Sequence, residues 1–357
     1  MRTWIKARSA DVLCATGIDK VVGSVTRPRN MPIIVGYHRV VEDFPSSART
    51  AIPSLLITRE MLERQLDWIG RRYRFVDLNE LGSQLEEGVV PRQPVAAVTF
   101  DDGYRDFHDV ALPLLRKKGI PAALFVVTDL VGTSRIQLHD KLYLLLVRRL
   151  SRESDTAHRS PVRHHGTTPP FPAGMAPFPA TRFLLETLSF AALQQLSEAL
   201  EAEDQLPQSI LQPFHSVTWE MLARICNAGI IVGSHTSTHV LMPNESEQRA
   251  RDEARNSRLA IEHRLGTRVQ HFAYPSGAVD AGSVRAVAAA GYKCGFTTCF
   301  HQSPQDPMLT VPRTLLWENS SVDHRGEFSG SILSCQLHGA FDLLAGCRQR
   351  HGFTRSK

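Results

Sequence analysis

The sequence predicts an α/β protein whose parallel sheet closes into a barrel. Short apolar segments alternate with helical patterns along the 357 residues. Seven such segments joined by helical crossovers suit a barrel better than an open sheet. No internal repeat is visible. The strand candidates are residues 32–37, 73–77, 94–100, 121–127, 229–234, 269–274 and 292–298.

The helical patterns between these segments repeat their apolar side chains with the 3.6-residue period of an α-helix. The clearest, TREMLERQLDWIGRRY, begins at Thr58, a residue type that favours the N-cap position. Its apolar residues share one face: Met61, Leu62, Leu66 and Ile69. The other predicted helices are 78–87, 107–118, 218–228, 246–265 and 281–290.

One region interrupts this alternation. Residues 151–180 are rich in Pro, His, Arg, Ser and Gly, which indicates a long surface loop between helices at about 138–150 and 182–202. We therefore expect a single domain over residues 31–357, with an insertion at about 135–213 and a C-terminal helix. The loop histidines lack acidic or cysteine partners, which favours a solvated loop over a metal site: His158, His164 and His165.

Composition bears on the class of partner. Lys plus Arg exceed Asp plus Glu by 41 to 36, but the basic residues are scattered and not interleaved with aromatic ones. Nucleic-acid binding is therefore not expected, whereas an anionic sugar polymer or a membrane surface suits the charge. The six cysteines include no CxxC pair, which indicates reduced, structural thiols.

Residues 1–30 predict a separate N-terminal helical segment. Charged side chains interrupt each of its apolar stretches, which argues against a signal peptide or a membrane-spanning helix. The segment is expected to pack on the domain, and a position at a membrane interface is the alternative. The expected location is the cytoplasm or the periphery of the inner membrane.

The stretch VAAVTFDDGYRD places two carboxylates, Asp101 and Asp102, at the end of an apolar strand. Neighbouring side chains of a strand point to opposite faces, so both can reach one pocket only if the backbone leaves strand geometry. Gly103 permits such a turn. Adjacent carboxylates repel each other, so one of them needs a nearby cation. An ordinary surface turn is the alternative.

A second pair of titratable residues, His235 and His239 in GIIVGSHTSTHV, also follows an apolar strand. In a helical turn, residues four apart share a face, so two imidazoles can reach one ion. Two neutral imidazoles and one carboxylate suit Zn²⁺ or a similar divalent ion. Because functional groups in parallel barrels gather where the strands end, the two motifs together predict a metal site. A third strand end, Tyr274 in HFAYPSG, runs into a Pro-x-Gly corner that can aim a backbone N–H into the same pocket; an ordinary turn is the alternative.

In this order, TFDDG (99–103), HTSTH (235–239) and FAYPSG (272–277) resemble the motifs of NodB-type polysaccharide deacetylases, carbohydrate esterase family 4. The resemblance covers roughly residues 94–300. It implies a distorted (β/α)7 barrel and the metal-dependent removal of acetyl groups from sugars.

The same resemblance implies a role for each matching residue. Asp101 resembles the general base, and Asp102, His235 and His239 resemble the ligands of one divalent ion, Zn²⁺ with Co²⁺ or Ni²⁺ as alternatives. The backbone N–H of Tyr274 resembles the donor to the oxyanion. The arginine that is common in the third motif is absent, and Arg313 in TVPRTLL is a weak match for it.

The family also uses a histidine as general acid, for which the chain offers two candidates. His338 follows a leucine near the C-terminus, but the apolar spacing around it predicts a helix. Biofilm poly-N-acetylglucosamine deacetylases resemble a circular permutation of the family, with the acid histidine on an N-terminal strand. IIVGYH looks like that strand, so the resemblance favours His38 over His338.

These observations predict an N-deacetylase that acts on N-acetylated sugars of a cell-envelope or exported polysaccharide. An O-acetyl esterase and a non-catalytic carbohydrate-binding descendant are the alternatives. The expected partner is a polysaccharide or oligosaccharide, in reach of the membrane periphery or of polysaccharide-synthesis machinery.

Overall fold

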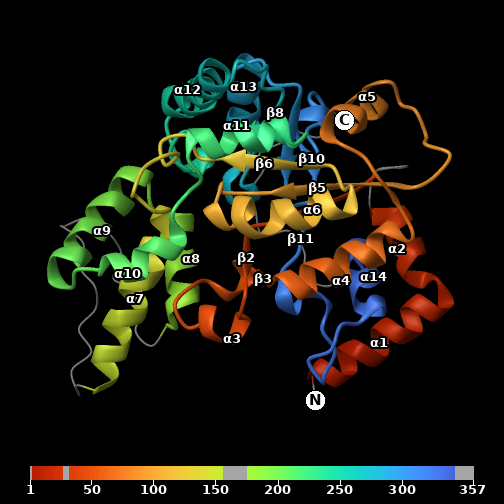
Figure 1. Ribbon diagram of the computed structural model, residues 1–357, viewed down its shortest axis with the longest axis horizontal. Coiled ribbons are helices and arrows are strands. Elements are labelled where there is room, and N and C mark those ends of the chain that lie inside the picture. The colour runs from red at the N-terminus through yellow and green to blue at the C-terminus, as the bar shows by residue number, and fades with distance from the viewer. Residues whose placement is uncertain (1, 27–31, 156–174, 342–357) are drawn as a thin grey trace.

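The computed structural model describes residues 2–26, 32–155 and 175–341, and its centre is a parallel sheet (Figure 1). The strands follow the order β10-β9-β8-β7-β6-β5-β1-β11, and every neighbouring pair is parallel. Their bounds are β1 (Ile33–Tyr37), β5 (Val95–Phe100), β6 (Ala122–Val126), β7 (Ile231–Ser234), β8 (His271–Ala273), β9 (Cys294–Thr297), β10 (Val311–Pro312) and β11 (Thr314–Leu315).

The sheet closes through one short segment, residues 311–315. Its first half, β10, pairs with β9, and its second half, β11, pairs with β1. Only Arg313 separates the two halves, so the segment acts as one strand that joins both edges of the sheet. Counted in this way, the ring has seven parallel strands, and the predicted (β/α)7 barrel is confirmed.

Six of the seven predicted strands belong to this ring, and the seventh is a shorter strand of the same sheet that lies outside the ring. The segment 73–77 forms only the short strand β4 (Arg74–Phe75), which pairs with β5 outside the path around the ring. Residues 311–315 take the seventh place. Pro312 and Arg313 gave that segment the appearance of a loop, because proline cannot donate to the ladder and arginine seldom lies in a barrel core.

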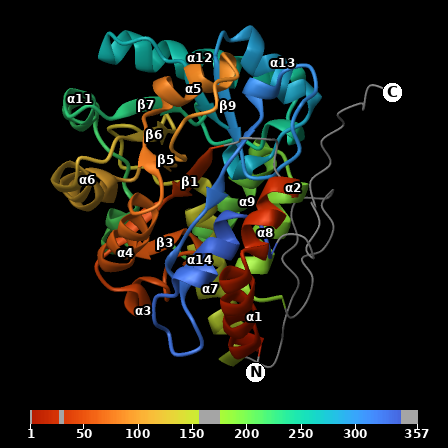
Figure 2. The same ribbon diagram turned by 90° about the vertical axis from the view of Figure 1, so that its right-hand side faces the viewer.

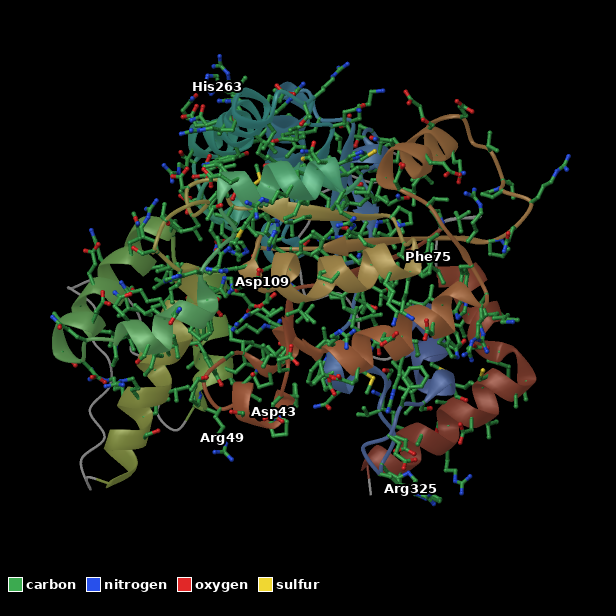
Figure 3. The ribbon with its side chains drawn as sticks, viewed as in Figure 1. Asp43, Arg49, Phe75, Asp109, His263 and Arg325 are labelled. Carbon is green, nitrogen blue, oxygen red and sulfur yellow. The ribbon has the colours of Figure 1, made fainter. Side chains whose placement is uncertain are left out.

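The crossover helices match the predicted ranges closely. Thr58 caps the first of them, since its hydroxyl accepts a hydrogen bond from the Met61 N–H at 3.1 Å. Phe107–Ala111 form a π-helical turn that leads into α6. Polar side chains project outward from this shell, among them His263 in the last turn of α12 (Figure 3). The bounds are α4 (Arg59–Gly70), α5 (Leu78–Glu86), α6 (Leu112–Lys118), α11 (Trp219–Asn227), α12 (Glu247–Leu265) and α13 (Ala281–Ala289).

The insertion forms a group of helices beside the barrel (Figure 1). They are α7 (Leu138–Asp155), α8 (Pro177–Thr187), α9 (Phe190–Glu203) and the short α10 (Gln208–Leu211). The helix predicted at 182–202 is two helices, because Ser189 caps a new one by accepting from the Ala192 N–H. Within the loop predicted at 151–180, residues 156–174, including its three histidines, lie outside the described residues.

The insertion has an apolar cluster of its own, which meets the barrel at β2 (Arg39–Val41), β3 (Leu56–Thr58) and α3 (Phe44–Ser47). Leucines of α7, α8 and α9 fill this cluster, and Val41 and Leu56 join it from the two-stranded sheet β2-β3. The insertion is thereby anchored to the segment that directly follows β1.

The N-terminal helices α1 (Arg2–Thr16) and α2 (Ile18–Thr26) lie together with α14 (Gly330–Leu337) on one side of the barrel (Figure 2). Ala7 and Ala10 of α1 pack against Ile332 and Cys335 of α14. Across the described ranges, none of the helices combines the length and the apolar character needed to cross a bilayer.

Candidate metal and catalytic site

The aspartate turn, residues 101–104, leaves strand geometry directly after β5, as predicted. Asp101 still belongs to the ladder, since its N–H donates to the Tyr37 carbonyl at 2.9 Å. Asp102 then adopts a left-handed conformation with φ of 70°, and Gly103 follows at 67°. This reversal brings both carboxylates into the interior of the protein, where their residues are 3% and 2% exposed.

The histidine loop, residues 235–239, follows β7, and here the predicted helical turn was wrong. The segment is a loop in which Thr236 and His239 have left-handed φ values of 67° and 64°. A buried carboxylate from α12 holds it: Glu253 accepts from the N–H groups of Ser237 and Thr238 at 2.8 and 2.9 Å, and from the Thr238 hydroxyl at 2.7 Å. The loop still brings the rings of His235 and His239 to a centroid distance of 4.9 Å.

The two loops converge on one point. Oδ1 of Asp102 lies 3.6 Å from Nε2 of His235 and 3.2 Å from Nε2 of His239. In the described part of the chain, these three residues form the one group whose ligand atoms all lie within 4.8 Å of one another. The structure therefore brings together the three residues predicted to hold an ion.

Hydrogen bonds and charges prepare these side chains as ligands. Nδ1 of His235 lies 2.7 Å from the Ala273 carbonyl. A carbonyl can only accept a hydrogen bond, so Nδ1 carries the proton. The lone pair of Nε2, on the side of Asp102, is then free to bind an ion. Burial lowers the pKa of His235 to about 4, which keeps the ring neutral. Burial alone would raise the pKa of Asp102, but His239 and the other nearby imidazoles outweigh it and hold the pKa well below its ordinary value.

A divalent cation fits this donor set. Oδ1 of Asp102 is buried without a hydrogen-bond partner, and such an atom is costly unless another group satisfies it. One ionised carboxylate with two neutral imidazoles is a set that Zn²⁺ and similar ions accept. The three side chains come from the carboxyl ends of two strands, which is where parallel barrels place their functional groups.

Arg313 supports the second aspartate. Its guanidinium donates from Nη1 and Nη2 to the two carboxylate oxygens of Asp101 at 2.8 and 2.7 Å, and also to the Thr99 hydroxyl at 2.9 Å. The side chain of Arg313 is fully buried inside the barrel. Burial would raise the pKa of Asp101, but Arg313 and His235 outweigh it, so the pKa lies below its ordinary value. The strand that closes the barrel thus supplies the arginine that motif three lacks.

His38 lies at the end of β1, beside β5. The parallel register pairs Tyr37 with Phe100, so His38 and Asp101 stand next to each other at adjacent strand ends. Burial and other neighbouring charges affect the pKa of Asp101 and of Asp102 more strongly, but His38 also contributes to lowering both pKa values. Its Nδ1 is buried and has no hydrogen-bond partner.

The competing histidine, His338, lies elsewhere. It caps the C-terminal end of α14, where its ring contacts the hydroxyl of Tyr73 at 3.3 Å and the carboxylate of Asp19 at 3.7 Å. His338 therefore lies among α2, α14 and the segment after α4.

Tyr274 requires a correction. Its N–H, predicted to face the pocket, donates to the Phe296 carbonyl at 3.0 Å as part of the sheet. Its side chain is fully buried and packs on Phe272 with ring centroids 5.0 Å apart. The following corner, η5 (Pro275–Gly277), is present, with Ser276 at a φ of 54°. The third motif, FAYPSG (272–277), instead contributes the Ala273 carbonyl, which orients the ring of His235.

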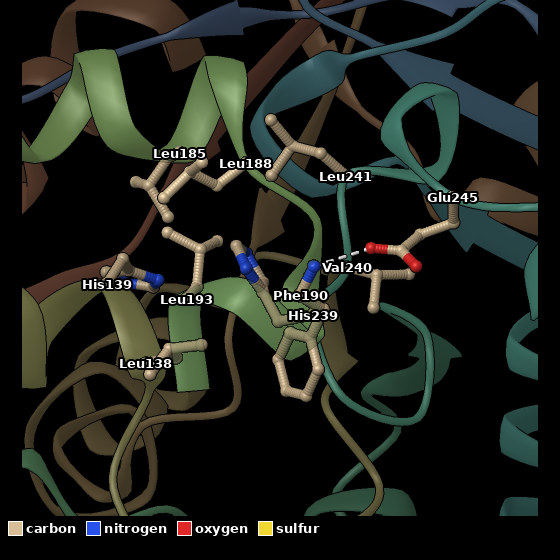
Figure 4. A pocket seen from close by; sticks show the side chains of 10 residues that line it. All are labelled: Leu138, His139, Leu185, Leu188, Phe190, Leu193, His239, Val240, Leu241 and Glu245. Atoms are coloured by element: carbon tan, nitrogen blue, oxygen red, sulfur yellow. Dashed lines mark hydrogen bonds between the residues drawn. The ribbon is translucent and has the colours of Figure 1, made fainter. Parts of the chain in front are cut away.

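Sequence reasoning missed a third imidazole, His139, in the first turn of α7. Its Nε2 lies 3.9 Å from Oδ2 of Asp102, and its ring centroid lies 4.9 Å from that of His239. Figure 4 shows the two rings in a small pocket whose other lining is mostly leucine from α8, α9 and the loop after His239. The stretch QLHD in the sequence carried a weak signal, because two titratable residues interrupt an otherwise apolar helix start.

The fold and the site define a class: a seven-stranded parallel barrel with a candidate divalent-metal site at the carboxyl ends of its strands. Residues 88–168 and 176–295, more than half of the chain, match the family model described as polysaccharide deacetylase. The chain therefore belongs to the polysaccharide deacetylase family, hydrolases that remove acetyl groups from polysaccharides. The match begins after β1, so His38 lies outside it.

Known proteins resemble the chain to different extents. A poly-beta-1,6-N-acetyl-D-glucosamine N-deacetylase of Staphylococcus epidermidis is 29% identical over 136 residues, which are 36% of this chain and 46% of that protein, so the match spans less than half of the curated relative. The deacetylase PplD of Streptococcus pyogenes, solved with acetate, has a TM-score of 0.55 at 18% identity, covering 86% of this chain and 98% of its own. IcaB from Ammonifex degensii has a TM-score of 0.54 at 17% identity, with coverages of 86% and 97%. These two structures show the same fold.

Proposed function

We propose that this protein is a metal-dependent deacetylase that hydrolyses N-acetyl groups of an amino-sugar polysaccharide. The observation that carries the proposal is the convergence of Asp102, His235 and His239 beside an ionised Asp101 and the early imidazole His38. The Staphylococcus epidermidis relative, named for poly-beta-1,6-N-acetyl-D-glucosamine, favours an N-acetylhexosamine polymer of the cell envelope or of an exported polysaccharide.

Asp102, His235 and His239 would hold the ion, which when bound supplies Lewis-acid activation of water and of the acetyl carbonyl. Asp101 takes the proton of the attacking water. Two features suit it to this role: its carboxylate is ionised at neutral pH, and the two bonds from Arg313 fix its plane. Asp101 is thus a base of fixed orientation, which precedes the ligand Asp102 in the chain and would stay outside the ligand set.

The departing nitrogen needs a proton, because C–N cleavage would otherwise expel a strongly basic amide anion. His38 is placed to provide it from the strand beside Asp101. The water proton goes to Asp101, the His38 proton goes to the nitrogen, and the C–N bond breaks. The products are acetate and a free amino sugar.

The test is acetate release from a panel of acetylated oligosaccharides by protein of known metal content. We expect release from N-acetylglucosamine oligomers, and loss of that release in His38→Ala. A protein that cleaves only O-acetyl esters, with His38→Ala nearly as active as the parent, would contradict the proposal, because an ester leaving group needs less help from an acid. A protein that binds no divalent metal and releases no acetate would instead be a carbohydrate-binding descendant.

A further inference from the structure

The conformation of Asp102 needs support from outside its own strand. A left-handed non-glycine residue costs on the order of 1–3 kcal/mol and persists only where its surroundings fix it. Asp102 has a φ of 70°, and the β1–β5 register ends at Phe100, before the turn begins. The support for this metal ligand must therefore come from other segments.

The entry of the insertion provides one such support. The side-chain amide of Gln137 donates to the backbone carbonyl of Asp102 at 3.2 Å, in a buried position. The hydroxyl of Tyr104 donates to Oδ2 of Asp140 at 2.5 Å. Since that hydroxyl has a single proton, its oxygen accepts from Nε2–H of His139, which lies 3.1 Å away. The first turn of α7 thus binds the aspartate turn at Asp102 and at Tyr104.

The exit of the insertion holds the same turn from the other side. The Val217 N–H donates to the Gly103 carbonyl at 2.9 Å, and the Arg105 N–H donates to the His215 carbonyl at 3.0 Å. Tyr104 and Ser216 form an antiparallel bridge between these two bonds. Residues 103–105 are therefore paired along their length with the chain that leaves the insertion.

The start of the insertion also contacts the histidine loop. The ring of His139 lies against that of His239, with centroids 4.9 Å apart (Figure 4). Both rings line the small pocket under the leucines of α8 and α9. One turn of the insertion therefore touches both loops that carry metal ligands.

We propose that residues 137–140, at the start of the insertion, and residues 215–217, directly after it, form a brace that holds the aspartate turn and thereby sets the affinity of the metal site. Gln137 of this brace and Tyr104 of the turn that it holds are positioning residues, because they fix the turn at Asp102 and do not act on an ion or substrate. The inference rests on the proposed function only in taking Asp102, His235 and His239 as the ligands.

The brace is tested by Co²⁺ competition titration and by the Co²⁺ absorption spectrum, with the thermal midpoint of the ion-free protein measured alongside. In Gln137→Met and in Tyr104→Phe we expect Co²⁺ to bind about tenfold more weakly than to the parent, with an altered spectrum, as for loss of a partner that orients a ligand. Gln137→Glu, which keeps the length but loses the donor, should resemble Gln137→Met.

The matched control is Arg148→Met. Arg148 forms two bonds to Asp204, both 2.6 Å long, inside the insertion and away from the turn. This variant should lower the thermal midpoint while leaving Co²⁺ affinity at low temperature unchanged. Parental Co²⁺ affinity and spectrum in both brace variants would overturn the proposal, as would equal weakening by Arg148→Met. A parent protein that binds no Co²⁺ at all would instead contradict the proposed function.

Discussion

The aspartate turn and the histidine loop face the same structural problem and solve it differently. Each carries a candidate metal ligand on a left-handed residue, Asp102 at a φ of 70° and His239 at 64°. The histidine loop is held by the carboxylate of Glu253, on the crossover helix that follows it in the barrel, and by backbone N–H groups of Thr128 and Asp129 after β6. The aspartate turn is held by the two ends of an insertion. One half of the candidate site is therefore supported from within the barrel, and the other half by segments at the borders of the helices beside it.

This difference has a physical reason. Glu253 lies sixteen residues after Ser237, on the helix that packs directly over β7. The aspartate turn instead runs through a π-helical turn into α6, and the carbonyls of Asp102 and Gly103 accept from Gln137 and Val217, which lie outside that helix. Groups from another part of the chain must satisfy them, since buried backbone groups without partners are costly. The insertion meets this requirement.

The largest expected effect is loss of a ligand. His239→Ala should lower the affinity for Zn²⁺ or Co²⁺ by more than about a hundredfold, beyond the cost of losing an outer-sphere partner, and acetate release should disappear with the ion. Metal content by elemental analysis and activity at several metal concentrations would measure both effects. His338→Ala is the control, because its ring contacts α14 and the N-terminal helices, and it should retain metal and activity.

The second effect separates the two aspartates. Asp101→Asn should lower kcat by about 10³-fold, the usual contribution of a general base, while metal content stays near that of the parent. Asp102→Asn should lose metal and activity together, because Oδ1 of Asp102 is the atom that faces both imidazoles. Parallel loss of metal in the Asp101 variant would show that the two carboxylates share one role.

A third effect concerns the strand that closes the barrel. In Arg313→Met, burial acts on Asp101 without the opposing guanidinium, so its pKa should rise. Asp101 is active when ionised, that is, above its pKa, so the acidic limb of the kcat/KM profile should move to higher pH. Activity at acidic pH should be lost first. The pH profile of the variant measures this directly, and an unchanged acidic limb would contradict the assignment of Asp101 as the base.

The same variant affects stability, and the sign can be worked out. The depressed pKa of Asp101 contributes stability above its unfolded value, and that contribution is lost as pH falls through the folded pKa. Removing one partner of a buried pair costs about 3–5 kcal/mol. The double variant Asp101→Asn/Arg313→Met carries no buried charge at this pair, so its free energy of unfolding should exceed that of Arg313→Met alone.

The sequence predicted those parts of the site that depend on local pattern. The apolar runs before Asp101 and before His235 made both motifs strand ends, and Gly103 signalled the reversal that Asp102 begins. The position of His38 required the family resemblance, since nothing local distinguishes it from a structural histidine. The pairing of β1 with β5 explains why it stands where it does.

The remaining parts depend on contacts between segments distant in the sequence. Arg313 reaches Asp101 across 212 residues, and this contact exists only because residues 311–315 close the ring. Gln137 and Glu253 act through hydrogen bonds to backbone groups of distant segments, and such bonds leave no periodic pattern in the sequence. The predicted role of the Tyr274 N–H was wrong for the same reason: a turn motif does not reveal that its first N–H belongs to the sheet.

The smallest expected effect tests the histidine side of the comparison. Glu253→Gln keeps the shape of the side chain and one oxygen for the N–H groups of Ser237 and Thr238, but it loses the charge and the second oxygen, which accepts from the Thr238 hydroxyl and pairs with Arg249. Metal affinity should fall by about threefold to tenfold, at the lower end of the range for outer partners of a ligand loop.

Glu262→Gln is the matched control, because Glu262 lies on the same helix but pairs with Arg258 and the Val269 N–H. It should leave metal affinity unchanged. Combining Glu253→Gln with Gln137→Met then measures whether the two supports act separately. Independent supports give free energies of metal binding that add within about 0.5 kcal/mol, and a larger deviation would show that His139, which contacts His239, couples the insertion to the histidine loop.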